Sequence, residues 1–159
     1  HDVANTAMDP TTEVLLYAAS RAQHVAQLIR PSLASGAVVL CDRFAGSTMA
    51  YQGYGRGLDQ TMLQQLTAIA TGGLTPDLTL LLDLDVARGL ERREIGGEEM
   101  NRLDLEALSF HERVRQGYLK MAAAAPARWL LIDADRPVTA VQADLQRVVA
   151  KRLGETAVG

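Results

Sequence analysis

The sequence predicts an α/β domain, because short apolar runs alternate along it with segments of helical periodicity. Three runs have the length of strands: residues 37–41 (AVVLC), 78–84 (LTLLLDL) and 129–132 (WLLI). They do not alternate polar and apolar residues, which is typical of parallel strands buried on both faces. The segments between them are long enough for helical crossovers, so we expect a parallel sheet covered by helices.

The first helix is predicted to begin at Asp9 and to extend to residue 35. Asp9 is a suitable N-cap, Pro10 suits the first helical position, and Gly36 is a suitable stop. Pro31 removes a backbone donor inside this segment. We therefore expect the helix to kink or split near Arg30.

Three further helices follow from apolar residues repeated at helical spacing. The second ends at Gly72-Gly73, the third covers residues 103–125, and the last follows Pro137. The side chains predicted to face the core are Leu63, Leu66, Ile69 and Ala70 in the second helix, Leu108, Val114 and Leu119 in the third, and Val138, Val141, Leu145, Val148 and Val149 in the last.

Length and composition indicate one globular domain: 159 residues are 48% hydrophobic and 22% charged. Sixteen basic and 19 acidic residues give a net charge of -3, which argues against a protein that coats nucleic acid or a membrane by bulk charge. The single cysteine excludes an internal disulfide framework and fits the cytoplasm. The sequence contains neither an apolar run long enough to span a membrane nor a signal-peptide pattern.

Residues 41–58 (CDRFAGSTMAYQGYGRGL) have neither helical nor strand periodicity, so we predict a loop. It follows an apolar run, and ligands of parallel sheets bind beyond the carboxyl ends of the strands. Asp42 can hold metal-bound waters, and the guanidinium of Arg43 matches phosphate oxygens. The alternative is that Asp42 and Arg43 form a structural ion pair at the end of the sheet. Cys41 is predicted to be buried in the strand.

Two further groups of residues suggest a nucleotide site. Tyr17 and Arg21 lie one helical turn apart, so the ring can stack on a planar base while the guanidinium bonds its edge. The alternative is a packed tyrosine beside a solvated arginine. A basic cluster surrounds a Gly96-Gly97 pair and can close as a lid over a phosphate, or can be a solvated charged turn. Its members are Arg88, Arg92, Arg93 and Arg102.

Four segments, in order, resemble bacterial thymidylate kinases: LLYAASRAQH, DRFAGSTMAYQGYGRGL, PDLTLLLDLDVARGLERR and NRLDLEALSFHERVRQGYLKMA. The resemblance extends from Thr12 to about Val149. It implies a P-loop kinase fold, with a three-layer parallel sheet and helices on both faces. It also implies transfer of the γ-phosphoryl group of ATP to dTMP with Mg²⁺, in dTTP biosynthesis, by a cytoplasmic homodimer.

The resemblance also implies roles for individual residues. Arg21 would bond the thymine edge, Tyr17 would stack on the ring, and Arg43 would contact the acceptor phosphate, while Asp42 would arrange Mg²⁺ through water. The residues that would line the base and sugar are Ser47, Thr48, Tyr51 and Gln52. The arginines that would serve a lid at about residues 92–102 are Arg92, Arg93 and Arg102, and Arg136 would lie in the adenine-side loop. Asp42, Arg43 and the lid arginines would form the catalytic set.

One signature of that family is missing from the sequence, which contains no Gly-Lys pair and hence no G-x-x-x-x-G-K-[ST] loop. In the family this loop follows a central strand, and a sheet without that strand would have unpaired backbone at its centre. We therefore expect a preceding portion of about 30 residues or more. We also expect that the 159 residues alone do not turn over ATP.

Two alternative functions remain open at this stage. A non-catalytic relative that keeps the nucleotide-binding surface would explain the missing loop. Another nucleotide or nucleoside kinase would share the fold and differ in its acceptor, because fold alone does not decide function.

Overall fold

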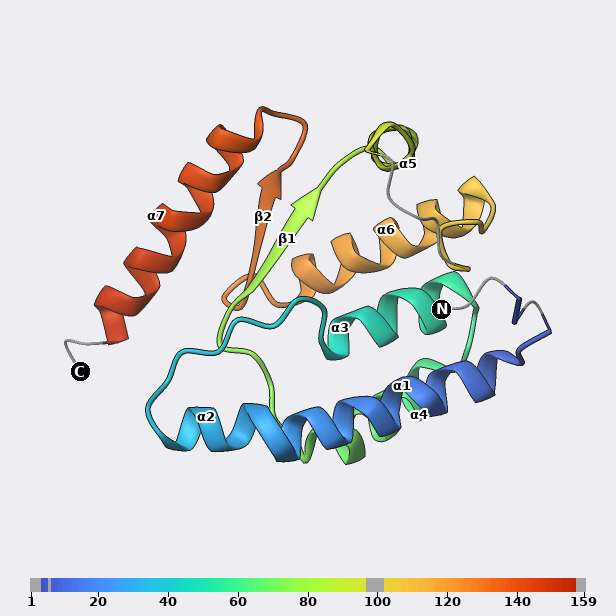
Figure 1. Cartoon of the computed structure of the whole chain (residues 1–159), viewed down its shortest axis with the longest axis horizontal. Coiled ribbons are helices and arrows are strands. Elements are labelled where there is room, and N and C mark those ends of the chain that lie inside the picture. Colours follow the sequence, from blue (N-terminus) through green and yellow to red (C-terminus); the bar gives the residue numbers. More distant parts are fainter. Residues whose placement is uncertain (1–3, 6, 97–101, 157–159) are drawn as a thin grey trace. The chain divides into compact units, whose positions relative to one another are not determined.

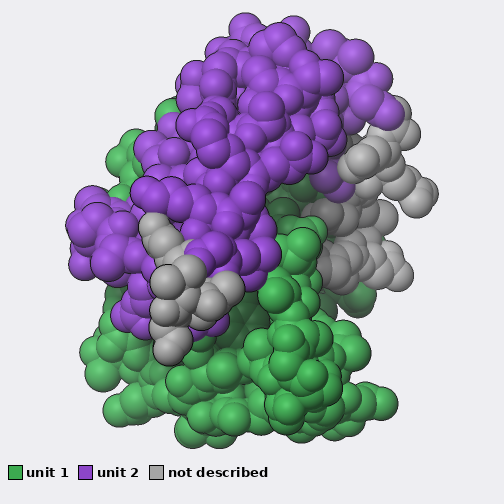
Figure 2. Space-filling model, turned by 90° about the vertical axis from the view of Figure 1, so that its left-hand side faces the viewer, with its two compact units in different colours: residues 1–76, 99–121 green, residues 77–98, 122–159 purple. Residues whose placement is uncertain are grey.

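The computed structural model describes residues 4–5, 7–96 and 102–156. The chain divides into two compact units, coloured separately in Figure 2. The first comprises residues 1–76 and 99–121, and the second comprises residues 77–98 and 122–159. The expected single domain of residues 1–159 remains a prediction.

The first unit is built from helices (Figure 1). They are α1 (Pro10–His24), η1 (Val25–Ile29), α2 (Arg30–Ala34), α3 (Ala45–Thr48), η2 (Met49–Gly55), α4 (Gln60–Thr71) and α6 (Leu108–Ala124), where η marks a π-helix and the last three residues of α6 belong to the second unit. In this unit α1 packs against α4, and α4 also contacts α3 and η2. One buried cluster comprises Ala50, Leu103, Phe110 and Val114.

The predicted limits of the first helix are confirmed. The Asp9 carboxylate accepts a hydrogen bond from the Thr11 N–H at 2.8 Å, and Pro10 is the first helical residue. The expected split near Arg30 is also found, because the π-helical turn η1 separates α1 from α2. Gly36 has a positive φ of 81°, as a helix stop requires.

Several apolar positions of the later helices do not face the core. In α4, Leu63 is fully buried as predicted, but Ile69 is 78% exposed. Six residues at about 100° each place Ile69 about 120° around the helix axis from Leu63, so the two side chains do not share one face. The third helix begins at Leu108 rather than residue 103, and Leu108 is exposed. Val138, at the start of the last helix, is exposed as well.

The predicted strand at residues 37–41 is wrong. The structure has no strand there, and the side chains of Val38 and Leu40 are exposed, as is Cys41, which we predicted to be buried. A strand needs a hydrogen-bonded neighbour. No described residue pairs with this segment in a sheet.

The predicted loop at residues 41–58 is wrong for its central part, because residues 45–55 form α3 and η2. Small residues explain the error: they carry little periodic signal, yet they allow close packing. A Cβ atom on Gly55 would lie 2.6 Å from the Phe110 ring and 2.9 Å from Val114. The segment is therefore a buried helix that packs against α6.

The second unit contains α5 (Val86–Ile95), α7 (Val138–Thr156) and two parallel strands, β1 (Thr79–Asp83) and β2 (Trp129–Asp133) (Figure 1). The register pairs Thr79 with Trp129 and Asp83 with Asp133, which confirms the two later strands. Their predicted burial on both faces is wrong in part, since Leu82 and Leu131 are each 50% exposed. In the described residues this sheet has two strands and packs against α7, so much of its apolar surface stays open.

No helix among the described residues is long and apolar enough to cross a membrane.

Candidate functional site

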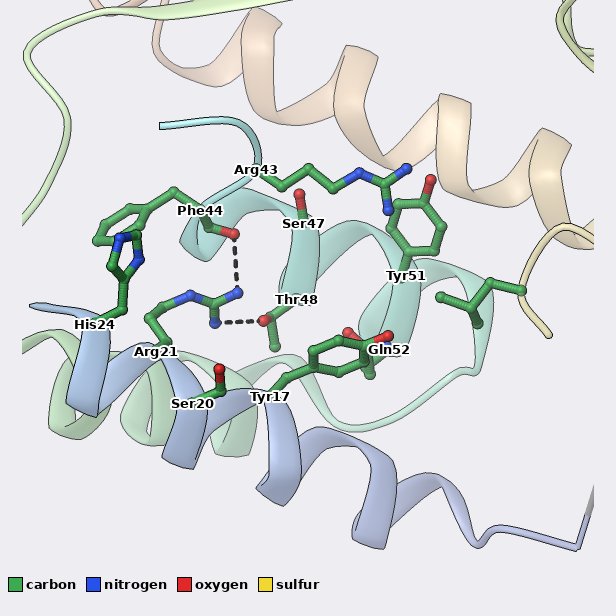
Figure 3. Close-up of a pocket in the computed structure, with 11 residues that line it drawn as sticks. Tyr17, Ser20, Arg21, His24, Arg43, Phe44, Ser47, Thr48, Tyr51 and Gln52 are labelled. Carbon is green, nitrogen blue, oxygen red and sulfur yellow. Dashed lines mark hydrogen bonds between the residues drawn. The ribbon is translucent and has the colours of Figure 1, made fainter. Parts of the chain in front are cut away.

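A pocket of about 240 Å³ lies in the first unit, between α1 and the segment that forms α3 and η2 (Figure 3). The two walls are far apart in sequence but contribute polar and aromatic groups to the same space. The lining residues are Tyr17, Ser20, Arg21, His24, Arg43, Phe44, Ser47, Thr48, Tyr51, Gln52 and Leu103. All seven residues that the resemblance assigns to acceptor binding are among them.

Arg21 is held firmly within the pocket. Its Nη1 donates to Thr48 Oγ1 at 2.7 Å, and its Nη2 donates to the Phe44 carbonyl oxygen at 3.2 Å (Figure 3). Burial lowers the pKa of Arg21 from that of a free arginine. The guanidinium is therefore a fixed donor beside the position that would hold the edge of a planar ligand.

Arg43 adopts an unusual backbone conformation, with a φ of 60°. Such a value is uncommon for a residue other than glycine, and strain of this kind is concentrated at functional sites. Its guanidinium lies 5.0 Å from the centroid of the Tyr51 ring, so the side chain reaches over the pocket (Figure 3). Among the described residues Arg43 and Asp42 form no salt bridge with each other, so the structure does not support a capping ion pair.

A buried carboxylate, Glu13, lies one helical turn before Tyr17 on α1 and is only 2% exposed. It accepts a hydrogen bond from Gln52 Nε2 at 2.8 Å and forms salt bridges with Arg56, at 3.3 Å, and with Arg102. Arg56 also pairs with Glu106 at 2.6 Å. Burial alone would raise the pKa of Glu13, but the hydrogen bonds from Arg102 and Gln52, with Arg56 nearby, hold it below its ordinary value.

This lowered pKa predicts a loss of stability in acid. The carboxylate stabilises the folded state above the ordinary pKa of 4.5, and that contribution is lost as the pH falls through the lower folded-state pKa. Unfolding free energies from urea titrations between about pH 7 and about pH 3 should therefore fall less steeply for Glu13→Gln than for the wild type. Parallel curves for the two proteins would contradict this prediction.

Tyr118, on α6, supports the other wall of the pocket. Its hydroxyl donates to Ser47 Oγ at 2.8 Å, and its ring packs edge-on against Tyr51. Burial raises the pKa of Tyr118 to about 12, so the phenol is neutral and remains a donor at physiological pH. Tyr118 thus sets the position of Ser47 and Tyr51.

The predicted lid arginines are placed separately by the structure. Arg92 pairs with Asp135 at 3.0 Å and donates to the Ala134 carbonyl, all within the second unit. Arg88 shares Asp135 at 2.8 Å. Arg102 pairs with Glu13 in the first unit. Residues 97–101, including the predicted hinge at Gly97, lie outside the described residues.

Arg136 lies after β2, as predicted, and contacts acids of the second unit. It pairs with Asp144 at 2.6 Å and donates to the Asp133 carbonyl oxygen at 3.0 Å. Its assignment to an adenine-side loop stays a prediction.

A dedicated metal cage is not found among the described residues, where no group of three histidine, cysteine or acidic side chains could hold an ion. Mg²⁺ usually binds through one or two carboxylates, waters and substrate phosphates. The exposed Asp42, beside the pocket residue Arg43, fits that mode of binding.

Glu13 and Tyr118 are the two supporting residues that sequence reasoning missed. The first had a usable signal, because Glu13, Tyr17 and Arg21 repeat every four residues on one helix face. Tyr118 had none, since 71 residues separate it from Ser47.

Comparisons with known proteins give a consistent result. A family model described as Thymidylate kinase matches residues 2–145. A protein named thymidylate kinase from Thermosynechococcus vestitus is 53% identical over 150 residues, which cover 94% of this chain and 62% of that protein. Proteins of the same name from Geotalea uraniireducens and Geobacter sulfurreducens are 48% and 50% identical over 97% and 96% of this chain. The chain covers 75% and 74% of these two proteins.

Proposed function

The chain belongs to the thymidylate kinase family, and we propose that its pocket binds dTMP as acceptor of the γ-phosphoryl group of ATP, giving dTDP and ADP. The observation that supports this most strongly is the convergence of Tyr17, Arg21 and Arg43 on one pocket. They provide a stacking ring, a donor for a base edge and a cation for a phosphate, which are the three groups that a nucleotide acceptor needs.

The size and walls of the pocket support a mononucleotide. Its volume of about 240 Å³ lies just below the usual range for small-molecule sites, about 300 to 1,000 Å³, so it suits a small ligand rather than an extended one. Tyr51 and Ser47 are braced by Tyr118, so a sugar in the pocket would meet fixed side chains. A rigid Tyr51 would crowd a 2′-hydroxyl and favour deoxyribose.

The family uses ATP, and we assign the divalent ion to Mg²⁺, held by Asp42 through water together with substrate phosphates. Bound there, the ion would offset phosphate charge during transfer. Arg43 would hold the acceptor phosphate. The complete protein would have the three-layer P-loop kinase fold and would form a homodimer in the cytoplasm.

The ion pairs of the lid arginines suggest which of them assists phosphoryl transfer. The Arg102 and Glu13 side chains are 12% and 3% exposed, and such a buried pair is costly to break. Arg92 and its partner Asp135 are 46% and 43% exposed, and exposed ion pairs exchange partners easily. We therefore assign the cation that assists transfer to Arg92 and a holding role to Arg102.

The test is an assay of ADP release by the complete gene product with ATP, Mg²⁺ and each of dTMP, dUMP, dCMP and dGMP. The complete product is needed because the 159 residues contain no Gly-Lys phosphate loop. We expect dTMP to have the highest kcat/KM. Equal values for all four acceptors, or no activity, would overturn the proposal and favour another kinase or a non-catalytic relative.

A further inference from the structure

We propose that Glu13 is a positioning residue: it fixes the orientation of the Gln52 amide, so that the pocket presents an acceptor to the N3–H of thymine or uracil. This inference rests on the proposed function, because it concerns how the same pocket selects its base. Gln52 lines the pocket together with Tyr17 and Thr48 (Figure 3).

The geometry leaves the Gln52 side chain little freedom. Glu13 and Gln52 are each 2% exposed, and Gln52 Nε2 donates to Glu13 Oε1 at 2.8 Å. Gln52 Oε1 forms no hydrogen bond with any described residue. The amide nitrogen thus points to the buried acid, while the oxygen keeps its capacity to accept.

The chemistry of Glu13 decides this orientation. An ionised carboxylate accepts hydrogen bonds and cannot donate them, so only the nitrogen end of an amide can face it. Arg56 and Arg102 both contact Glu13 Oε2, which leaves Oε1 for Gln52. These two cations keep Glu13 ionised, and a rotated Gln52 would place its oxygen against a buried negative charge.

A fixed acceptor distinguishes between the pyrimidines. Thymine and uracil carry a hydrogen on N3, whereas N3 of cytosine has a lone pair and no hydrogen. Gln52 Oε1 can therefore pair with the first two bases and would repel the third, and a buried group without a partner is costly. Glu13 imposes this selection without touching the nucleotide.

The test is Glu13→Gln in the complete gene product, with dissociation constants for dUMP and dCMP measured by calorimetry. These two nucleotides lack the thymine methyl group and differ only at C4 and N3. A glutamine at position 13 can either donate or accept, so the amide of Gln52 becomes free to rotate. We expect the preference for dUMP over dCMP to fall by about tenfold or more, since tenfold equals about 1.4 kcal/mol.

Glu106→Gln is the matched control. It removes the other carboxylate that holds Arg56 but does not contact Gln52, so the dUMP preference should stay at the wild-type value. If Glu13 had a merely structural role, Glu13→Gln would weaken the binding of dUMP and dCMP equally. The preference for dUMP over dCMP would then stay unchanged. That result would overturn the inference.

A second pair of variants covers the case in which Glu13→Gln does not fold because Arg102 has lost its acid. Glu13→Gln/Arg102→Gln restores the charge balance and is compared with Arg102→Gln alone. The preference for dUMP over dCMP should be about tenfold lower in the double variant than in Arg102→Gln. An equal preference in these two variants would overturn the inference. Failure of the wild type to bind either dTMP or dUMP would instead refute the proposed function.

Discussion

Replacing Arg43 by alanine is expected to lower kcat/KM for dTMP by about a hundredfold or more, because the guanidinium is the pocket's candidate cation for the acceptor phosphate. Hydrogen bonds to charged groups contribute about 1.5–3 kcal/mol each, and a forked arginine can form two of them with a phosphate. The measurement is steady-state ADP release at varied dTMP, with ATP saturating. The KM for ATP should change little, since the resemblance assigns Arg43 to the acceptor side.

Two further variants test whether the loss of activity is specific to the forked guanidinium of Arg43. Arg43→Lys keeps the charge without the fork and should recover part of the loss. Arg147→Ala removes an arginine that is 72% exposed in the second unit and should behave as wild type. If Arg43→Ala retained wild-type kcat/KM for dTMP, the phosphate role would be refuted.

The backbone of Arg43 offers a separate check on the same residue. A left-handed φ of 60° costs a residue with a Cβ atom about 1–2 kcal/mol relative to glycine. Arg43→Gly should therefore be more stable than Arg43→Ala by about that amount while losing just as much activity. Such a result would show that the protein keeps an unfavourable backbone conformation at position 43 because activity needs the arginine side chain.

The sequence predicted best those features that depend on local chemistry. The Asp9 cap, the interruption before Pro31 and the glycine stops at Gly36 and Gly72 all follow from the properties of single residues. Seven of the eleven residues that line the pocket were also predicted as one group, although by resemblance to a family. Spacing alone connected only Tyr17 to Arg21.

The errors arose where distant residues decide the structure. Residues 37–41 have the composition of a strand, but a strand forms only against a partner, and composition does not supply one. Residues 45–55 lack apolar periodicity because close packing against Phe110 and Val114 selects small side chains there. The contact of Arg102 with Glu13 was not anticipated either, because 89 positions of sequence separate the two residues; the lid role of Arg102 stays a prediction.

The contact between η2 and α6 explains how the pocket keeps its shape. Gly117 on α6 faces Tyr54, just as Gly55 on η2 faces Phe110. The close approach of the two helices brings the Tyr118 hydroxyl to Ser47. Any side chain added at this contact should therefore affect both stability and ligand binding.

Gly117→Ala is expected to destabilise the protein by about 1–2 kcal/mol. The new Cβ atom would lie 2.4 Å from Tyr54 Cδ2 and 2.8 Å from Tyr54 Cβ, and the latter cannot move without its backbone. Overpacking of this kind costs about 1–3 kcal/mol, and the higher helix propensity of alanine offsets only part of it. Urea unfolding would measure the change.

Gly154→Ala is the matched control, because this exposed glycine of α7 has no atom within 4 Å of the added Cβ. It should be stabilising by about 0.5–1 kcal/mol through helix propensity alone. Gly117→Ala should also weaken dTMP binding, because a shift of α6 would move Tyr118 away from Ser47. The Gly154→Ala variant should bind dTMP as tightly as the wild type does. Equal stabilisation by both substitutions would mean that η2 and α6 do not pack as closely as the structure shows.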